Sequence, residues 1–94
     1  MNLFGKKLLR EFIEKHTDAR SAIDSWEAEV EDANWNTSHE LKARYRRVNI
    51  IKGQVIFDIC DNRYRLWVFV NYKNKMVLVK KVGTHKEYDK WNIC

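Results

Sequence analysis

The chain has 94 residues, of which 45% are hydrophobic and 33% charged, and its formal net charge is +5. A chain of this length buries roughly 60–65% of its unfolded surface, which is enough for one core, so we expect a single domain over residues 1–94. No apolar run approaches the roughly 20 residues of a membrane helix, and the amino terminus does not read as a signal peptide. We therefore expect a cytoplasmic protein that does not bind membranes.

The charge is divided unevenly along the sequence. Residues 1–40 hold five Lys and Arg against nine Asp and Glu, whereas residues 41–94 hold thirteen against four, so the two parts carry −4 and +9. Neutralisation of phosphates by Lys and Arg is the main sequence-independent source of nucleic-acid affinity. The basic part suits a nucleic-acid partner and an acidic protein partner equally well, and charge alone does not decide between them.

The cysteines and histidines do not form a metal-binding pattern. Cys60 and Cys94 lack the C-x-x-C spacing, and we expect both to be free thiols. The histidines His16, His39 and His85 lie far apart in the sequence, and none has a partner at ligand spacing. We expect neither a metal ion nor another cofactor.

Two helices are predicted in the first third of the chain. From Lys6 to Lys15, apolar residues recur at helical spacing, at Leu8, Leu9, Phe12 and Ile13. A second stripe at this spacing follows a short connection, in which Thr17 or Asp18 can cap the helix. Its members are Ala19, Ala22, Ile23, Trp26, Val30 and Ala33. The short connection favours a helical hairpin that lies on a sheet.

A short third helix is predicted after a loop. Thr37 and Glu40 have the spacing of a capping box, which predicts a helix that runs through about Tyr45. Three arginines cluster at its end: Arg44, Arg46 and Arg47. They can simply be cations placed favourably near a helix carboxyl terminus, or they can form a platform for RNA phosphates, and the sequence favours neither reading.

Alternating apolar residues predict a β-hairpin whose turn is Asp61-Asn62. The register that aligns the apolar positions pairs Val55, Phe57 and Ile59 with Val68, Leu66 and Tyr64. This register places Asp58 opposite Arg65. The second face of the hairpin then holds Arg63, Arg65, Trp67 and Phe69.

A third strand is predicted from Met76 to Val82, after a turn at Lys73-Asn74. With Tyr72 opposite Lys75, Lys80 lies across from Trp67 on the face that holds Arg65. A leading strand at residues 2–4 completes a small, mainly antiparallel sheet. The expected fold class is α+β, with the helical hairpin packed on one face of the sheet.

Two segments near the carboxyl end carry a resemblance to a known family. A strand with the motif Tyr64-Arg65-Leu66 is followed by Gly83-Thr84-His85-Lys86-Glu87-Tyr88-Asp89. This pair of segments resembles the HigB family of bacterial toxins in the RelE/ParE superfamily, and the resemblance extends over nearly the whole chain. It implies a RelE-like fold and an mRNA interferase, an endoribonuclease that cuts mRNA in the ribosomal A site and so inhibits translation and growth. It also implies a HigA-type antitoxin, through which alone the toxin meets operator DNA.

The resemblance makes Arg65 an active-site residue, because the arginine of the Y-R-L motif corresponds to one in the superfamily. A guanidinium on a rigid strand can grip a phosphate and oppose the charge that develops in phosphoryl transfer. Residue types alone slightly favour an ordinary ion pair between Arg65 and Asp58. His85 can move a proton between the ribose 2′-hydroxyl and the leaving 5′-oxygen, although a histidine after Gly-Thr is more often structural.

Lys80 and Lys90 rank below these two, because each can donate to a nonbridging phosphate oxygen but a surface lysine is usually only solvated. Tyr88 can stack on a base and relay a proton through its hydroxyl, or it can simply pack the last turn. Trp67 can stack on a base or cover the sheet beneath the carboxyl-terminal segment. The expected catalytic residues are Arg65, His85, Tyr88, Lys80 and Lys90, and the expected RNA-binding residues are Arg44, Arg46, Arg47, Arg63, Trp67 and Lys86.

These groups suit transesterification, in which the 2′-hydroxyl attacks the adjacent phosphorus and leaves a 2′,3′-cyclic phosphate and a 5′-hydroxyl without a metal. Two alternatives remain, a ParE-like toxin that shares the fold and poisons DNA gyrase, and a noncatalytic RNA-binding module. Asp58 and Lys81 depart from the family pattern, which leads us to expect an amide and an apolar residue there. Asp58 therefore alters the charge expected near Arg65.

Overall fold

A computed structural model describes residues 1–91 of the chain. The helical elements are α1 (Lys6–Lys15), the 3-10 turn η1 (Thr17–Ala19), α2 (Arg20–Asp32), α3 (Ser38–Arg44) and α4 (His85–Tyr88), and the strands are β1 (Asn2–Phe4), β2 (Asn49–Ile51), β3 (Gln54–Ile59), β4 (Tyr64–Asn71) and β5 (Met76–Thr84). The strands form one sheet in the order β1-β5-β4-β3-β2, with a parallel pair at β1–β5 and antiparallel pairs elsewhere. The predicted α+β class is confirmed.

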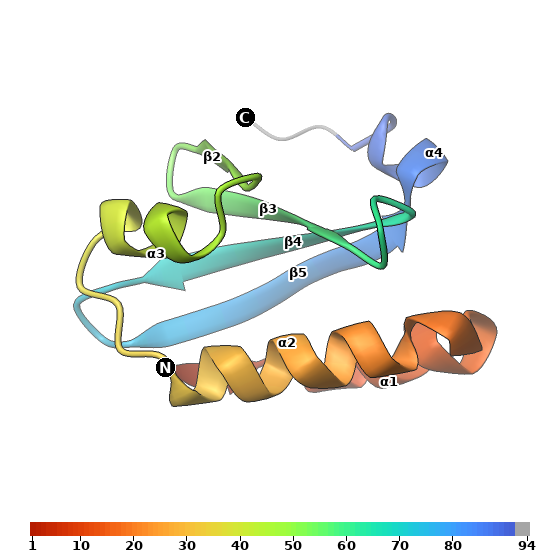
Figure 1. The fold of residues 1–94 in the computed structure, drawn as a ribbon, viewed down its shortest axis with the longest axis horizontal. Helices are drawn as coiled ribbons and strands as arrows, with labels where there is room; N and C mark the ends of the chain where they lie inside the picture. The colour runs from red at the N-terminus through yellow and green to blue at the C-terminus, as the bar shows by residue number, and fades with distance from the viewer. Residues whose placement is uncertain (92–94) are drawn as a thin grey trace.

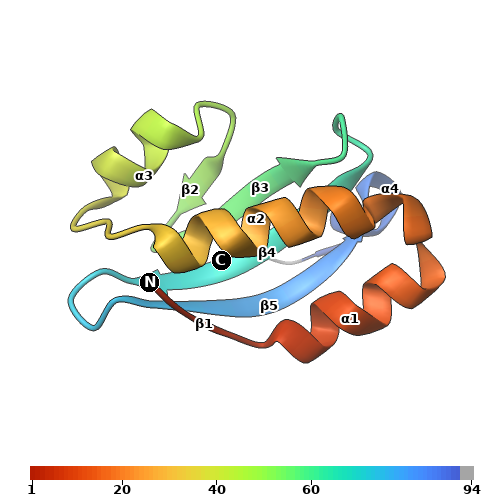
Figure 2. The same ribbon diagram turned by 60° about the horizontal axis from the view of Figure 1, so that its bottom comes forward.

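Helices α1 and α2 lie on the same face of the sheet (Figures 1 and 2). Their apolar stripes include the buried residues Leu9, Phe12 and Ile13 of α1 and Ile23, Trp26 and Val30 of α2. The buried core between them includes Leu9, Ile13, Ile23, Trp26 and Val30 from the helices and Val55, Leu66, Val68, Val77 and Val79 from the strands. This arrangement follows from periodicity, because a stripe repeating every 3.6 residues can be buried only against an apolar surface. Leu8, which was also predicted to face inward, is 40% exposed.

Ion pairs on the outer surface tie α1 to α2. The Arg10 guanidinium lies 3.0 Å from an Asp24 carboxylate oxygen and 2.6 Å from one of Glu27, and the Lys6 ammonium lies 3.0 Å from Glu31. These side chains account for part of the acidic charge of the first forty residues. Being largely exposed, such pairs each stabilise the fold by at most about 1 kcal/mol.

The helix starts were predicted with mixed success. The Thr37 hydroxyl accepts a hydrogen bond from the backbone N–H of Glu40 at 3.3 Å, and α3 begins there as predicted. The predicted cap of the second helix is wrong, because the structure shows no side-chain cap at the start of η1 or α2. Asp18 instead accepts hydrogen bonds from the Tyr64 hydroxyl at 2.7 Å and from Arg63 at 3.0 Å, so its carboxylate serves tertiary contacts.

The hairpin of β3 and β4 has the predicted register. Ile59 faces Tyr64, Phe57 faces Leu66, Val55 faces Val68 and Asp58 faces Arg65. Both turn residues, Asp61 and Asn62, have positive φ angles, of 55° and 74°. Asn and Asp tolerate this conformation better than most residues, which suits a tight two-residue turn.

The register of β4 with β5 corrects one prediction. The two strands start as expected, with Val68 opposite Val79, but a β-bulge between Trp67 and Val68 shifts the remaining pairs by one residue. Lys81, and not Lys80, therefore lies across from Trp67. A bulge adds one residue to one strand, and nothing in an alternating sequence pattern marks its place.

Strand β1 completes the sheet as predicted, by pairing with β5, whereas β2 was not predicted. All three residues of β2 are exposed, and the strand lies at the sheet edge. Without a buried side, a three-residue strand lacks the alternation that would reveal it. None of the helices in residues 1–91 is both long and apolar enough to cross a membrane.

Candidate active site

Arg65 lies in the central strand β4 and is only 7% exposed. Its Nε atom is 3.0 Å from a carboxylate oxygen of Asp58, so the cross-strand ion pair favoured by residue types is formed. Its Nη1 atom donates to the backbone carbonyls of Asn62 at 3.2 Å and Tyr64 at 3.5 Å. Within residues 1–91, these contacts hold the guanidinium through Nε and Nη1, and no hydrogen bond from Nη2 is found.

The segment that carries the second motif folds into the end of β5 and one turn of helix α4. The Thr84 hydroxyl accepts a hydrogen bond from the Glu87 N–H at 3.2 Å, and the Glu87 carboxylate accepts one from the Thr84 N–H at 2.9 Å, which completes a capping box. The bond from the Thr84 backbone lowers the pKa of Glu87. The His85 N–H donates to the Arg63 carbonyl at 3.2 Å, which anchors α4 to the hairpin turn.

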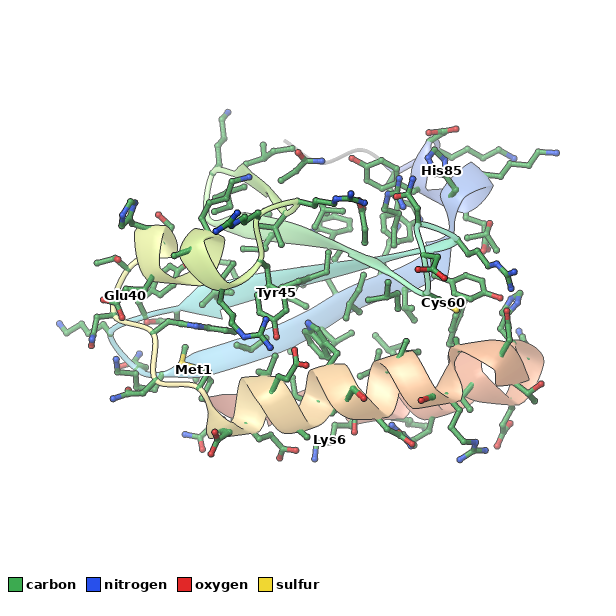
Figure 3. The ribbon with its side chains drawn as sticks, viewed as in Figure 1. Met1, Lys6, Glu40, Tyr45, Cys60 and His85 are labelled. Atoms are coloured by element: carbon green, nitrogen blue, oxygen red, sulfur yellow. The ribbon has the colours of Figure 1, made fainter. Side chains whose placement is uncertain are left out.

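This local structure brings three predicted catalytic side chains together. The Arg65 Cζ atom lies 5.4 Å from the centroid of the Tyr88 ring. The Tyr88 and His85 rings are 6.4 Å apart, with an angle of 82° between their planes. Figure 3 shows His85 at the α4 end of the molecule, far from Met1 and Glu40. The guanidinium, the phenol and the exposed imidazole therefore gather on the side of the sheet that carries α4.

Aromatic rings continue from Tyr88 back to the sheet. The Trp91 ring lies 5.6 Å from Tyr88 and 6.0 Å from Trp67, and the Trp67 indole N–H donates to the Gln54 side chain at 2.6 Å. The Lys81 ammonium lies 5.7 Å from the Trp67 ring centroid and 6.0 Å from that of Trp91. Trp67 is thus both fixed on the sheet and partly covered by the carboxyl-terminal segment, as one of its two predicted roles requires.

Sequence reasoning missed Trp91 and Lys81 as members of this site. Trp91 follows the second motif directly, and an aromatic residue at that place was the available signal. Lys81 was placed on the other side of β5 because the bulge was not foreseen. Gly83 explains why α4 can approach so closely, because a Cβ atom there would lie 3.0 Å from the Trp91 ring and 3.2 Å from the Glu87 carboxylate.

Two predicted residues differ from their expected places. Lys80 lines a cleft of about 270 Å³ beside α1 together with Lys81 and Trp91, but Lys81 is the lysine beside the Trp67 and Trp91 rings. Arg63, expected on the Arg65 face, forms an ion pair with Asp18 at 3.0 Å on the side of the helices. It belongs to the turn that precedes β4, where the positive φ angles interrupt the alternation on which the expectation was based.

The arginines after α3 are divided between two environments. Arg44 lies 3.3 Å from Glu29 and 4.8 Å from the Tyr45 ring centroid, so contacts within the protein explain the position of its side chain. Arg46 and Arg47 are exposed and line a cleft of about 200 Å³ that also contains Asp58, the partner of Arg65. Only this second pair adds positive charge close to the site.

The remaining predicted residues, Lys86 and Lys90, are exposed on α4 and just after it, close to His85 and Tyr88. Cys60 is a free thiol whose Sγ lies 3.6 Å from the Asp18 carbonyl, and Cys94 lies outside the described residues. Within residues 1–91, no three side chains are grouped as a metal ion would require. The side chains of Arg65, Tyr88 and His85 can stabilise charge and transfer protons.

A protein-family model described as HigB_toxin, a RelE-like toxic component of a toxin-antitoxin system, matches residues 19–91. The chain belongs to the HigB toxin family. A curated relative, the mRNA interferase HigB of Escherichia coli O6:H1, is 24% identical over 93 residues, which cover 96% of this chain and 90% of the relative. The family predicted from the two motifs is confirmed. As a HigB toxin, the protein is the toxic component of a toxin-antitoxin system, and this implies an antitoxin partner.

In this HigB toxin, the Y-R-L motif and the Gly-Thr-His segment are parts of one structural unit. The first supplies Arg65 from the centre of the sheet, and the second places Tyr88 over it. Two segments that lie about twenty residues apart in sequence thus meet because β4 and β5 are antiparallel neighbours, with Arg65 opposite Gly83.

Proposed function

We propose that this HigB toxin is an mRNA interferase that cleaves mRNA on the ribosome and so inhibits translation and growth. The observation that carries the proposal is the convergence of Arg65, Tyr88 and His85 on one side of the sheet. A charge-stabilising group next to two proton-transferring groups suits phosphodiester cleavage without a metal. The name of the E. coli relative supports the same activity.

Arg65 is the group proposed to oppose the charge that develops on the scissile phosphate. Its bonds to Asp58 and to two backbone carbonyls hold it in place before the substrate arrives. A preorganised donor costs no reorganisation during the reaction, so it stabilises the transition state more than the ground state. The free Nη2 edge would donate to a nonbridging phosphate oxygen.

His85 is proposed to accept the proton of the ribose 2′-hydroxyl. The O2′ atom then forms a bond to phosphorus while the bond from phosphorus to O5′ breaks. The Tyr88 hydroxyl gives its proton to the leaving oxygen and regains one from the protonated His85, so both side chains return to their starting state. The products are a 2′,3′-cyclic phosphate and a 5′-hydroxyl. Lys90 and Lys81 are placed to compensate the negative charge of the strand, and Lys81 takes over the position that had been expected for Lys80.

The RNA is proposed to contact the exposed cations and rings around this centre. Trp67 and Lys86 adjoin the catalytic group, and Arg46 and Arg47 flank Asp58. Arg44 and Arg63 rank lower, because each already faces a carboxylate. A strand that follows these residues meets much of the positive charge of residues 41–94.

Dependence on the ribosome follows from the small size of this centre. General acid-base catalysis contributes about 10² to 10⁴-fold, and α4 is a single turn of helix with no buried residue. Such a site cleaves more rapidly when the ribosome holds the mRNA in a reactive geometry. The toxin would act in the cytoplasm, where a HigA-type antitoxin neutralises it and alone contacts operator DNA.

The proposal is tested by translation of one transcript in a purified system with and without the protein, followed by mapping of transcript ends at nucleotide resolution. New 5′ ends that require ribosomes are expected. An absence of new ends, together with DNA damage in cells that express the protein, would instead support a gyrase poison.

The burial and ion pair of Arg65 favour one second candidate, a noncatalytic RNA-binding module. In such a module, Arg65 would be a structural residue and His85 would be dispensable. The His85→Ala variant separates the two functions, because growth arrest by a binding module would survive this change.

A further inference from the structure

A row of mostly apolar side chains crosses the sheet on the face away from α1 and α2. Strand pairing aligns one residue from each of the five strands: Phe4, Leu78, Phe69, Gln54 and Ile51. Their neighbours along the strands, Val55, Val68, Val70, Val77 and Val79, belong to the core on the opposite face. Phe4, Phe69 and Ile51 are 47%, 38% and 36% exposed. Contiguous exposed apolar side chains often belong to interaction sites, and of these three residues Phe69 alone lies on the central strand.

Phe69 connects this row to the candidate active site. Arg65, Trp67 and Phe69 alternate along β4, so all three point to the same face. Four residues of strand span about 13 Å, which an extended single strand covers within a few nucleotides. The Gln54 side chain, which holds the Trp67 indole, lies directly opposite Phe69 in the neighbouring strand. A polymer bound at Arg65 and continuing along β4 would therefore meet the Phe69 ring.

The chemistry of the surroundings favours an unpaired nucleic-acid strand over a protein. From Phe69, strand β4 leads past Trp67, whose ring centroid lies 5.7 Å from the Lys81 ammonium, to the Arg65 guanidinium. Alternating cations and flat rings are what an unstacked ribonucleotide chain uses, because its phosphates need charge and its bases need stacking partners. A protein partner would gain from the apolar row but would have to leave these cations solvated or pair them with acidic side chains.

We propose that Phe69 is a base-stacking subsite for single-stranded RNA, a few nucleotides from the linkage held at Arg65. The inference rests on the proposed function for the identity of the polymer. It adds that the RNA is bound along the centre of the sheet as well as at α4. The Phe69 ring is available to a base because it is exposed on the central strand, and the hydrophobic core lies on the other face.

The test measures binding of a fluorescently labelled single-stranded RNA by anisotropy at low salt. Every 2′-hydroxyl of this RNA is methylated, so it cannot be cleaved and the result does not depend on any catalytic assignment. Phe69→Leu removes the aromatic face and keeps an apolar side chain, and Phe69→Trp keeps an aromatic face. The matched control is Phe4→Leu, which removes a similarly exposed ring from the same row, two strands away at the edge of the sheet. Thermal melting of each variant checks the fold.

We expect Phe69→Leu to weaken binding at least about 5-fold, as loss of one stacked base predicts. Phe69→Trp and Phe4→Leu should bind as the wild type does. Equal binding by Phe69→Leu, equal weakening by Phe69→Leu and Phe4→Leu, or no binding by the wild type would each overturn the subsite. So would a Phe69→Leu variant that binds RNA normally but no longer copurifies with the antitoxin, because the row would then be a protein interface. Cleavage of translated mRNA by the wild type is measured separately, so failure of the subsite is distinct from failure of the nuclease.

Discussion

The Tyr88 ring lies over the Arg65 guanidinium, with 5.4 Å between the ring centroid and the Cζ atom. Arg65 comes from the central strand β4, and Tyr88 comes from α4, which follows the neighbouring strand β5. The contact therefore exists only in the folded protein. It joins the buried Arg65 of this HigB toxin to the exposed residues of α4.

Arg65→Ala should reduce cleavage of translated mRNA about 10² to 10³-fold, the usual cost of removing a preorganised donor. Lys90→Ala should reduce it far less, since Lys90 is an exposed residue after α4. Initial rates from transcript-end mapping measure both. Equal residual rates would contradict the ranking. Arg65→Ala should also lower the free energy of unfolding by about 1–3 kcal/mol, because Asp58 loses its partner. Rates are therefore compared at a temperature where chemical denaturation shows both variants to be folded.

His85→Ala should abolish growth arrest and slow cleavage about 10² to 10⁴-fold, the range of general acid-base catalysis. Folding and antitoxin binding should persist, because the His85 side chain is exposed. His39→Ala is the matched control, since His39 is an exposed histidine on α3, far from this end of the molecule. Undiminished toxicity of His85→Ala would identify the protein as a binding module.

Tyr88→Phe should slow cleavage while leaving affinity for RNA unchanged, because it removes only the proposed proton relay. Tyr88→Ala should lose both, since the ring that covers Arg65 and contacts Trp91 is gone as well. Cleavage rates and anisotropy titrations with uncleavable RNA separate the two effects. If Tyr88→Phe cleaves at the wild-type rate, the hydroxyl takes no part and the ring alone matters.

The contact of Asp18 with the hairpin of β3 and β4 should make the thermal stability of the protein depend on pH. The hydrogen bond from the Tyr64 hydroxyl, with help from Arg63, holds the pKa of Asp18 below its usual value. The stabilisation is therefore present above the unfolded pKa of about 4 and is lost as the pH falls through the lower folded pKa. Asp18→Asn should lower the melting temperature at neutral pH, and the difference from the wild type should shrink in acid.

The control for this prediction is Asp32→Asn, which removes a carboxylate from the exposed end of α2. Its melting temperature should follow that of the wild type at every pH. A difference between Asp18→Asn and the wild type that stays constant down to acid pH would mean that the charge of Asp18 does not contribute to stability.

Most of the fold could be predicted because buried apolar residues recur at regular spacing along a helix or a strand. The α1 stripe predicted a helix with the observed bounds, and alternation in β3 and β4 set the register that pairs Asp58 with Arg65. The features that were missed do not produce such regular spacing. The bulge adds one residue without changing the apolar pattern around it, so Lys80 was placed where Lys81 lies.

The candidate site could be predicted only where motifs supplied it. Arg65, His85 and Tyr88 were named from the Y-R-L and Gly-Thr-His segments, and the structure brings them together. Trp91 joins them through a contact between the carboxyl-terminal segment and β4 that sequence spacing does not reveal. Arg63 was misplaced for a related reason, since Asp18, its partner, lies 45 residues away in the sequence.

The most direct test of the central claim uses an mRNA in which the nucleotide at the mapped cleavage position lacks its 2′-hydroxyl. If Arg65 and His85 act on one linkage through attack by this hydroxyl, the wild-type toxin should no longer cut the modified mRNA there. The unmodified mRNA should yield ends that carry a 2′,3′-cyclic phosphate and a 5′-hydroxyl. Undiminished cleavage at the modified position, with 5′-phosphate ends, would contradict the account.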